Sequence, residues 1–586
     1  MVDKISAILQ GGIIVKAGRA ILDLLKQHNV NDVFGLPGET TLDLYRNWCN
    51  RDDVSYHLCR DERNSVFMAG AYSKASGKVG VCEGPSVGAP HMIPGIAEAF
   101  YSNTPVICIT SDVPLKYATR NMLTSCDQTA LFKSVTKETL TIHNAQDIPH
   151  IFRRAFRSAS SGITGPVHIR IPSDILSGEV SDSDVYSNIN SGMFPEFRFS
   201  PSDDMIQKAV SLIAKSERPA MVCGQGSTLS GAWDEIRSLV IMQSIAVGTT
   251  INAKGVVSDS LEMSLGVIGA RGGQKWSNDM INDADLVIFC GSSTDSASTN
   301  DWTIPNPKSQ QIFIEINSSE KELGNNYNSF PLHGDVQETL KKIIDALACV
   351  KLPDRSTWQN RLMIEKKHHE ETINFILKKH NNETHPLAVM KSIEKLAPGN
   401  TYYAVDPGTP AIYSSCFLNL AKEGRRTAYN FSMGALGYAI PAAIGAKIAL
   451  GKNVPVVGLV SDGSFGFCAG ELETAVRLGT NITYILFNNN TFGWIRATEY
   501  AHCKETLTNN FDKFTNFSNI DYVKFAESFG LKGYRANNMP EFDSIFTKCI
   551  ESDTSSLIEI TVMPEDKDMP PVPDWAEMAK KGYNSY

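Results

Sequence analysis

The sequence lacks the features by which nucleic-acid-binding and membrane-spanning proteins are recognised. It has no run of basic residues and no interleaving of aromatic with basic residues, and its formal net charge is −9 over 586 residues. No uninterrupted apolar stretch reaches the roughly 18 residues that a membrane-spanning helix needs. Neither nucleic acid nor a membrane is therefore expected as a partner.

Cysteine pairs of the C-x-x-C type are also absent. The twelve cysteines are scattered from Cys49 to Cys549, and this spacing fits neither a zinc site nor a disulfide framework. We expect reduced, mostly buried thiols. The segment from Met1 to Val15 has no basic stretch followed by an apolar run and a cleavage site, so export is not expected. These features predict a cytoplasmic protein.

The chain is too long for one hydrophobic core, and one pattern recurs along it: a short β-branched apolar run, then glycine, then an amphipathic helix. The predicted strands are residues 79–82, 106–109, 167–171, 220–223, 286–289, 312–315, 456–460 and 483–487. Continuous apolar runs between helices are typical of parallel strands buried on both faces. The predicted fold class is α/β, with three doubly wound domains and mainly parallel sheets.

Changes in composition predict the domain boundaries. The first domain covers residues 1–182, the central domain 205–348, the third domain 380–565 and a C-terminal tail 566–586. The polar stretch from Ser181 to Asp204 is the predicted linker. The end of the chain contains Pro564, Pro570, Pro571 and Pro573 and is predicted to be extended.

The segment around Asp462 has the pattern of a phosphate and metal site. Asp462 directly follows an apolar strand, and the residues after it, through Glu471, are predicted to open a helix. Ligands bind at the carboxyl ends of parallel strands, and helix N-termini donate to phosphate. Asn489 ends the next strand, so its amide oxygen and the Asp462 carboxylate converge on one hard cation. The alternative is a helix cap followed by an asparagine turn.

The block from Ser461 to Gly493 resembles the thiamine diphosphate fingerprint, GDG followed about 25–30 residues later by NN. This resemblance implies that Mg²⁺ is held by Asp462, Asn489 and the backbone carbonyl of Thr491. Ser461 replaces the first glycine, which is tolerated outside a glycine-only conformation. The block also contains the cofactor-binding candidates Gly463, Ser464, Phe492 and Gly493.

The first domain resembles the pyrimidine-binding domain of the same superfamily. Gly35–Glu39 ends a strand-like run, and Arg60–Arg63 precedes the block Met68–Ser73. The resemblance places Glu62 on the activating glutamate, which promotes the imino tautomer of the cofactor's aminopyrimidine. A lone glutamate at a strand end is more often solvated, but these surroundings favour the catalytic role. The resemblance also makes Pro37 and Gly38 cofactor-binding candidates.

Two further loops match the family. The loop Met433–Gly437 resembles the one that supports the bent cofactor, which makes Gly434 a contact and Leu436 the apolar wedge between its rings. Simple core packing is the alternative for Leu436. The segment Asp406–Thr409 matches the loop that approaches the diphosphate from the other side, which adds the candidates Gly408 and Thr409.

The resemblance covers nearly the whole chain and is strongest to acetolactate synthase-like and benzoylformate decarboxylase-like enzymes. In that family the cofactor lies between the pyrimidine domain of one subunit and the diphosphate domain of another. A homodimer or homotetramer is therefore implied. The implied reaction is decarboxylation of a 2-oxo acid, pyruvate by default, followed by protonation to an aldehyde or by attack on a carbonyl acceptor.

The sequence favours ligation over release of the aldehyde. Pyruvate decarboxylase-type enzymes carry a histidine pair in the region that corresponds to Ala118–Asp127, which here has no histidine. The pair His368-His369 lies in a Lys/Glu-rich helix and is predicted to be solvated. A non-ligating decarboxylase and a catalytically silent scaffold subunit are the alternatives. A scaffold predicts loss of the activating residues, whereas Glu62, Asp462 and Asn489 are present.

The acceptor pocket is predicted to be reshaped. The loop Glu83–His91 is longer than the SGPGATN turn of acetolactate synthases, and the family's pocket glutamine and tryptophan fall near Thr124 and Thr498. For His91, two roles are equally compatible with the sequence: a loop histidine with its hydrogen bonds made within the protein, or a substrate contact. The pocket candidates are Ser86, His91, Thr124, Gln128, Trp494 and Ile495.

The central domain has glycine-rich turns at Gly224–Gly226, Gly269–Gly273 and Gly291–Asp295. Relatives bind FAD or ADP here, or nothing, and a lone G-x-G is weak evidence. Ser293 replaces an arginine of acetolactate synthases, although Arg271 could reach a phosphate. FAD is left open as an additional cofactor.

Overall fold

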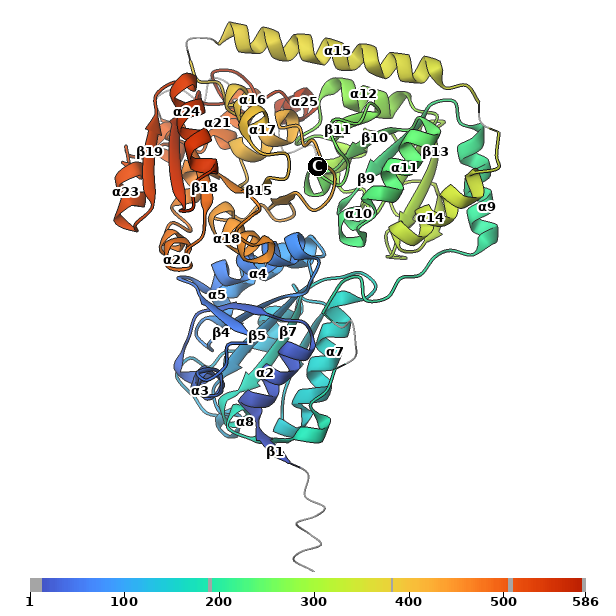
Figure 1. Ribbon diagram of the computed structural model, residues 1–586. Coiled ribbons are helices and arrows are strands. Elements are labelled where there is room, and N and C mark those ends of the chain that lie inside the picture. The colour runs from blue at the N-terminus through green and yellow to red at the C-terminus, as the bar shows by residue number, and fades with distance from the viewer. Residues whose placement is uncertain (1–12, 188–191, 352, 381–382, 504–509, 582–586) are drawn as a thin grey trace, which may run out of the picture. The chain divides into compact units, whose positions relative to one another are not determined.

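The computed structural model describes residues 13–187, 192–351, 353–380, 383–503 and 510–581. They form three six-stranded parallel sheets with intervening helices, which confirms the predicted α/β class (Figure 1). Residues 1–12, on which most of the expectation about export rests, and residues 188–191 of the predicted linker lie outside the described residues. The described chain divides into two compact units, one up to Phe197 with Ile444–Ala449, the other formed by the rest.

The first unit is built on a parallel sheet with strand order β3-β2-β4-β5-β7-β6. Its strands are β2 (Asp32–Gly35), β3 (Ser55–Leu58), β4 (Gly80–Gly84), β5 (Val106–Asp112), β6 (Glu138–Thr141) and β7 (Val167–Pro172). Its main helices are α2 (Ala17–Gln27), α3 (Leu42–Trp48), α4 (Glu62–Ser76), α5 (Ala89–Tyr101), α6 (Gln128–Lys133) and α7 (Ile148–Ser160). An antiparallel pair, β1 (Ile14–Lys16) with β8 (Glu179–Ser181), joins the two ends of this segment.

The second unit contains two parallel sheets. The central sheet, in the order β11-β10-β9-β12-β13-β14, consists of β9 (Pro219–Cys223), β10 (Ala246–Thr249), β11 (Ser264–Val267), β12 (Leu286–Cys290), β13 (Ile312–Asn317) and β14 (Ser329–His333). The third sheet, in the order β16-β15-β17-β18-β20-β19, consists of β15 (Tyr402–Val405), β16 (Thr427–Tyr429), β17 (Val456–Ser461), β18 (Ile482–Asn488), β19 (Lys532–Ala536) and β20 (Ser556–Thr561). Each apolar run that the sequence predicts as a strand overlaps one of these strands, and residue 79 alone falls outside, one position before β4.

Helices connect and flank these two sheets. In the central part they are α9 (Asp203–Lys215), α10 (Gln225–Ser230), α11 (Trp233–Gln243), α12 (Lys275–Asp283) and α14 (Val336–Leu347). In the third part they include α16 (Pro386–Leu396), α17 (Thr409–Phe417), α18 (Ala439–Leu450), α21 (Gly493–His502), α23 (Tyr522–Ser528) and α24 (Met539–Ile550). Between them runs α15 (Ser356–Lys379), whose Trp358 and Leu362 belong to the central core, while Ile373 and Ile376 pack against the third core.

All three sheets share one topological feature. After two strands in the first and third sheets, and after three in the central sheet, the chain returns to the other side of the first strand. Two neighbouring strands therefore send their connections in opposite directions. These pairs are β2 and β4, β9 and β12, and β15 and β17. Open α/β sheets bind ligands at the carboxyl ends of such a pair, because the diverging loops leave a crevice there.

Two local predictions are wrong. The helix predicted to follow Asp462 forms two short pieces, α19 (Asp462–Phe465) and α20 (Glu471–Arg477), with Gly466 and Gly470 between them, since glycine disfavours a continuous helix. The end of the chain is not extended throughout, because α25 begins at Pro573 and runs to Lys581. Proline is well suited to a first helical position, where its missing N–H is not needed.

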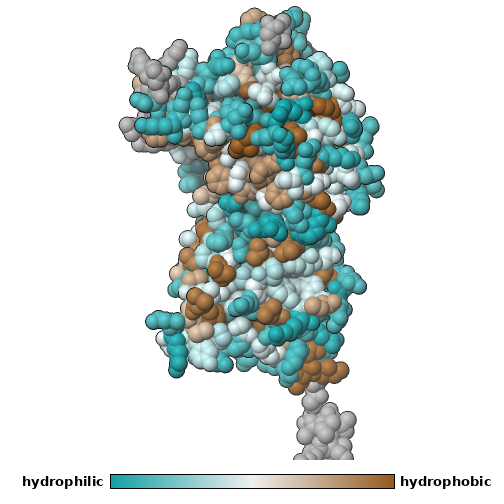
Figure 2. Space-filling model, turned by 90° about the vertical axis from the view of Figure 1, so that its left-hand side faces the viewer, coloured by the Kyte–Doolittle hydropathy of each residue, from teal (hydrophilic) through white to brown (hydrophobic). Residues whose placement is uncertain are grey.

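The surface and the thiols agree with the composition. All twelve cysteines are free, and most of them are buried. Among the described residues, no helix combines the length and apolar character that crossing a bilayer requires. On the face drawn in Figure 2, hydrophobic residues stand mainly in small groups among hydrophilic ones.

A buried histidine gives the first unit a specific pH response. His168 in β7 is fully buried, with its Nε2 atom 2.6 Å from Thr110 Oγ1 and its ring stacked on Phe132. Burial, together with the charge of Arg170, lowers the pKa of His168 to about 3. The unfolded chain takes up this proton below about pH 6.5, so His168 makes the folded state less stable as the pH falls from there towards 3.

We therefore expect His168→Asn to flatten the acid side of the stability profile. The difference in free energy of unfolding between wild type and variant should change by about 1.4 kcal/mol per pH unit between pH 6 and 4. Denaturant unfolding at several pH values measures it. His150→Asn, at an exposed histidine of α7, is the control, and a wild-type-minus-variant difference independent of pH would contradict the assignment.

Candidate functional site

Glu62 lies at the crevice of the first sheet. It is the first residue of α4, and Asp61 caps this helix by accepting a hydrogen bond from the Arg63 N–H at 2.8 Å. Only 7% of Glu62 is exposed. Its carboxyl therefore sits at the start of a helix that follows β3, beside the crevice between β2 and β4, and is not the solvated surface group that a lone glutamate usually is.

The loop between β4 and α5 packs on this carboxyl. A Cβ atom on Gly88 would lie 2.5 Å from Glu62 Oε1, so a larger residue there would displace the Glu62 side chain. On the other side, His91 Nδ1 lies 3.2 Å from Glu62 Oε2. The structure thus brings His91 directly to Glu62.

Glu83, at the end of β4, is a second buried carboxyl near Glu62. It accepts hydrogen bonds from the hydroxyls of Tyr45 at 2.7 Å and Tyr56 at 3.0 Å. Burial raises the pKa of Glu83 to about 7, and the charge of Glu62 acts in the same direction. A Cβ atom on Gly35 would meet Glu83 Oε2 at 2.7 Å, so the glycine at the end of β2 makes room for this network. The sequence pattern did not identify these partners.

The other candidates of the first unit differ in their surroundings. Gly38 packs against Pro85 of the opposite loop, and a Cβ atom there would lie 2.3 Å from the proline ring, while Pro37 is exposed. Ser86 Oγ lies 2.9 Å from Thr124 Oγ1, so these two candidates are in contact, and their place in a substrate pocket stays a prediction. Gln128 is fully buried, and its amide group is bonded to Thr110 and Ser111, so it does not face an open pocket.

The third sheet brings Asp462 and Asn489 together. β17 and β18 are adjacent and parallel, with Ser461 opposite Phe487. Asp462 Oδ2 accepts a hydrogen bond from the Asn489 N–H at 3.0 Å, and Asn489 Oδ1 accepts one from the Thr491 N–H at 3.2 Å. Asp462 is only 6% exposed, and burial raises its pKa to about 6. A buried carboxylate beside an amide oxygen is the donor set that a hard cation requires.

A carboxyl that the sequence did not predict completes this site. Glu565, just beyond β20, accepts a hydrogen bond from Thr409 Oγ1 at Oε1 and one from Asn489 Nδ2, 3.0 Å away, at Oε2. A Cβ atom on Gly493 would lie 1.8 Å from Oε2. Thr409 and Gly493 are the first residues of α17 and α21, and helix N-termini bind anions. The Glu565 carboxylate therefore occupies the space between the N-termini of α17 and α21, here called the anion cradle.

Burial raises the pKa of Glu565 to about 7, with Asp462 as a further charge that raises it. Its place just after a buried strand of the third sheet was the available signal, because ligand-binding groups gather at strand carboxyl ends. Thr409 and Gly493, both predicted cofactor contacts, are thereby joined through one group to the predicted metal ligand Asn489.

Asp406 braces the loops of the third sheet. It is fully buried at the end of β15, and its Oδ1 atom accepts hydrogen bonds from the N–H groups of Tyr438 at 2.9 Å and Ala439 at 2.8 Å. Gly437 N–H donates to Ser464 Oγ at 3.1 Å. These bonds tie the loop that carries Leu436 to the ends of β15 and β17.

Gly408 and Gly434 border open space, as a cofactor contact requires. Gly408 and Gly434 adopt positive φ angles of 91° and 69°, which favour glycine, and no atom lies within 4 Å of a Cβ position at either. Leu436 is half-buried beside them, and its wedge role stays a prediction. Gly463 packs under Phe492, whose ring would lie 2.8 Å from a Cβ atom.

Trp494 and Ile495 are the pocket candidates on α21, and Trp494 packs against the C-terminal tail. The Trp494 ring lies 4.0 Å, centroid to centroid, from that of Trp575 in α25. Ile495 is 52% exposed. This contact belongs to a small apolar cluster that packs α25 against α21.

In the central sheet, the glycine turns pack against each other. Cβ atoms on Gly224 and Gly226 would lie 2.4 Å and 2.8 Å from the backbone of Gly291. Close backbone approach is thus one reason for these glycines, independent of any nucleotide. Arg271 is half-buried and faces the charge of Asp301.

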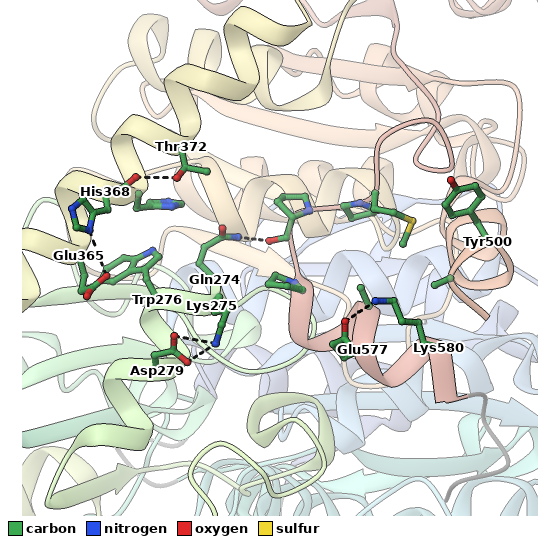
Figure 3. Close-up of a pocket in the computed structure, with 17 residues that line it drawn as sticks. Gln274, Lys275, Trp276, Asp279, Glu365, His368, Thr372, Tyr500, Glu577 and Lys580 are labelled. Carbon is green, nitrogen blue, oxygen red and sulfur yellow. Dashed lines mark hydrogen bonds and ion pairs between the residues drawn. The ribbon is translucent and has the colours of Figure 1, made fainter. Parts of the chain in front are cut away.

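A cavity of about 740 Å³ lies among α12, α15, α21 and α25 (Figure 3). At its edge Gln274 Nε2 donates to the Pro571 carbonyl at 2.7 Å. None of the predicted site residues lines it. His368 is 63% exposed there, as predicted, but the solvated-face prediction is wrong for His369, which packs beside Trp276 and Phe417 and whose pKa burial lowers to about 4.

A second cluster outside the predicted site contains His380, His385 and Asp568, whose ligand-type atoms lie within 4.8 Å of one another. His385 Nδ1 accepts a hydrogen bond from the Leu387 N–H at 3.1 Å, so Nε2 of the neutral ring carries the proton and has no lone pair for a metal. Asp568 also pairs with Lys379 at 3.0 Å. The cluster therefore fits a polar anchor of the tail better than a metal centre.

The fold and the site together define a thiamine diphosphate-dependent enzyme. It has three doubly wound sheets, with Glu62 at the crevice of the first sheet. Asp462, Asn489 and the anion cradle lie at the crevice of the third. Comparison with known families agrees. The N-terminal TPP binding domain of the thiamine pyrophosphate enzymes matches residues 15–131, their central domain matches 206–343 and their C-terminal TPP binding domain matches 406–560. The chain belongs to this family.

Within the family, the chain is acetolactate synthase-like. It is 29% identical over 565 residues to a probable acetolactate synthase large subunit of Methanocaldococcus jannaschii, covering 95% of this chain and 94% of the relative. It is 28% identical to a probable acetolactate synthase large subunit of Methanococcus aeolicus, covering 94% and 92%. The acetolactate synthase large subunit of Lactococcus lactis is also 28% identical, covering 94% and 93%.

Proposed function

We propose that the protein is a thiamine diphosphate- and Mg²⁺-dependent carboligase. It decarboxylates a 2-oxo acid, with pyruvate as the default, and transfers the acyl anion equivalent to a carbonyl acceptor. The observation that carries this proposal is the pair of half-sites: a nearly buried Glu62 in the first unit, and Asp462 with Asn489 beside an anion cradle in the second.

The cofactor, when bound, supplies the electron sink for loss of CO₂. The oxygens of Asp462 and Asn489 and the Thr491 carbonyl would hold Mg²⁺, because they are hard donors grouped at one strand end. The N-termini of α17 and α21, which now hold the Glu565 carboxylate, would hold the diphosphate. Glu62 would hold a proton against the pyrimidine nitrogen, a role that its low exposure favours.

Incubation with pyruvate, first alone and then with added aldehydes and ketones, tests the function. We expect CO₂ release with ligated product. Stoichiometric free aldehyde without any ligated product would instead support the alternative, a non-ligating decarboxylase. No cofactor-dependent CO₂ release at all, from any 2-oxo acid tried, would leave the scaffold alternative.

We also infer that the protein acts as a homodimer or homotetramer, with each cofactor site shared between two chains. Large exposed apolar side chains flank both half-sites: Val87 at 56% and Leu123 at 88% near Ser86, and Met433 at 54% and Phe467 at 46% near Gly437. Exposed apolar side chains that gather beside a site favour a surface that another protein covers.

Mixing two inactive chains tests the shared site. A Glu62→Gln chain combined with an Asp462→Asn chain forms mixed dimers in which one site keeps both groups. We expect recovery of up to about a quarter of the wild-type activity when subunits exchange freely. No recovery, in a mixture shown to exchange subunits, would place both groups of a site in the same chain.

Two further proposals concern cofactor and compartment. FAD in the central sheet stays open, since Gln225 Oε1 and Thr228 Oγ1 in α10 are buried without a hydrogen-bond partner among the described residues. The visible absorption spectrum of the purified protein decides whether a flavin is bound.

A cytoplasmic location is supported by the twelve free thiols, which fit a reducing compartment. Cell fractionation tests this location.

Because Glu565 occupies the anion cradle, we expect its removal to change cofactor affinity. Glu565→Ala should bind thiamine diphosphate about ten- to a hundredfold more tightly, since the cofactor no longer displaces a charged hydrogen-bonded group. Glu565→Gln, which keeps the shape but loses the charge, should lie between. Calorimetric titration in Mg²⁺ measures both. Weaker binding by both variants would instead make Glu565 part of the binding site.

A further inference from the structure

The segment from Gly88 to His91 encloses the Glu62 carboxyl from two sides. Gly88 lies so close to Oε1 that a Cβ atom there would be 2.5 Å away, and His91 Nδ1 lies 3.2 Å from Oε2. One short stretch of chain therefore contacts both oxygens of the group proposed to activate the cofactor.

The position of His91 is set by the start of α5. This helix begins at Ala89, and the His91 N–H donates to the Gly88 carbonyl at 2.9 Å, which fixes the first turn beside Glu62. The His91 side chain is 63% exposed, whereas that of Glu62 is only 9% exposed. The imidazole thus bridges a nearly buried carboxyl and the solvent-exposed rim.

The chemistry of His91 and Glu62 determines which group donates the hydrogen bond between them. An ionised carboxylate only accepts, and a neutral imidazole donates from one of its two nitrogens. The contact with Oε2 therefore selects the tautomer with the proton on Nδ1. The terminal torsion of a glutamate is broad and weakly fixed, so a donor on one oxygen and the Gly88 backbone against the other define the orientation of the group.

We propose that His91 is the positioning residue of Glu62, which holds the carboxyl in the orientation that cofactor activation needs. This inference rests on the proposed role of Glu62. His91 acts through the glutamate and not on the substrate, which separates it from the pocket contact that its place in the sequence suggested. The longer loop Glu83–His91 is the part of this chain that provides it.

Three substitutions test the donor atom. His91→Ala removes it, and we expect kcat to fall about ten- to a hundredfold with little change in KM, the effect of losing a hydrogen bond to a charged group. His91→Asn keeps a donor at the position of Nδ1, because both atoms are attached to Cγ, and should restore kcat to within about threefold of wild type. His91→Gln places its amide one bond further and should not.

The control is His150→Ala. His150 also lies in the first turn of a helix, α7, with a side chain that is 60% exposed, and its removal should leave kcat unchanged. A raised KM in His91→Ala with kcat unchanged would mean that the ring contacts substrate. Equal loss in the Asn and Gln variants, or no loss in the Ala variant, would overturn the proposal.

A second measurement needs no turnover. In protein labelled with ¹⁵N-histidine and free of cofactor, the His91 signal, assigned by its loss in His91→Asn, should report a proton on Nδ1. In Glu62→Ala this tautomer should decline towards the pattern of an exposed histidine such as His150. An identical His91 tautomer with and without the Glu62 carboxyl would show that the hydrogen bond does not exist.

The two proposals can fail separately. If Glu62→Gln leaves CO₂ release unchanged, the proposed function of the site is wrong, while the tautomer experiment still reports on the contact. If Glu62→Gln abolishes CO₂ release but His91→Ala behaves as wild type, only the positioning role is wrong.

Discussion

Glu62→Gln is expected to lower the rate of cofactor-dependent CO₂ release by about two to four orders of magnitude, the usual contribution of a positioned acid–base group. The amide has nearly the same size, so the packing of Gly88 against this side chain is retained. It cannot hold a titrating proton, however, and that proton is what cofactor activation requires. Steady-state assays of CO₂ release with saturating cofactor and Mg²⁺ measure the effect.

The matched control is Glu179→Gln. Glu179 is an exposed glutamate of β8 in the same unit, and its side chain forms a surface ion pair with Lys16. Its substitution should leave the rate within twofold. Cofactor binding by Glu62→Gln should remain measurable, because the diphosphate cradle lies on the third sheet. A rate within about tenfold of wild type would rule out the activating role.

Asp462→Asn is expected to abolish Mg²⁺-dependent cofactor binding, with an affinity at least about a hundredfold lower. The carboxylate accepts backbone hydrogen bonds from Gly463 and Asn489 and is the only charged group among the proposed metal ligands. A neutral amide offers the cation less attraction. It also turns one NH₂ group towards backbone donors that need an acceptor. Calorimetric titration with thiamine diphosphate measures the loss.

A chelator provides the companion measurement. Removing divalent cations from the wild type should reproduce the binding defect, and Mg²⁺ should reverse it, whereas the Asp462→Asn protein should respond weakly to both. Asp553→Asn, at an exposed aspartate in the turn before β20, is the control. Cofactor binding that survives chelation in the wild type would contradict a metal-dependent site.

Much of the candidate site was predictable because its residues stand next to local signals. Asp462 and Asn489 directly follow continuous apolar runs, and two adjacent parallel strands place their carboxyl ends together whatever the surrounding packing. Glu62 stands at the start of a helix after a strand, a position that the topology turns towards the crevice. The roles assigned to these residues remain predictions that the substitutions above test.

Other parts could not be predicted because they depend on contacts between distant segments. Thr409 and Glu565 are 156 residues apart. The position of Glu565 after a buried strand indicates the ligand-binding end of the sheet, but not that its carboxylate lies between α17 and α21. The extended tail was predicted from prolines alone, whereas the Trp494–Trp575 contact stabilises a helix. Gln128 is a pocket candidate in the sequence, but its amide is satisfied inside the core.

The sequence by itself determined the α/β class, the central buried strands of the three sheets and the family, because apolar runs, glycine turns and short motifs act over a few residues. Only the tertiary structure decided which groups meet: Glu565 in the anion cradle, Asp406 as the brace of the cofactor loops, and His91 on Glu62. Those contacts follow from how strands and helices are ordered in space, and strand order is not written in any local pattern.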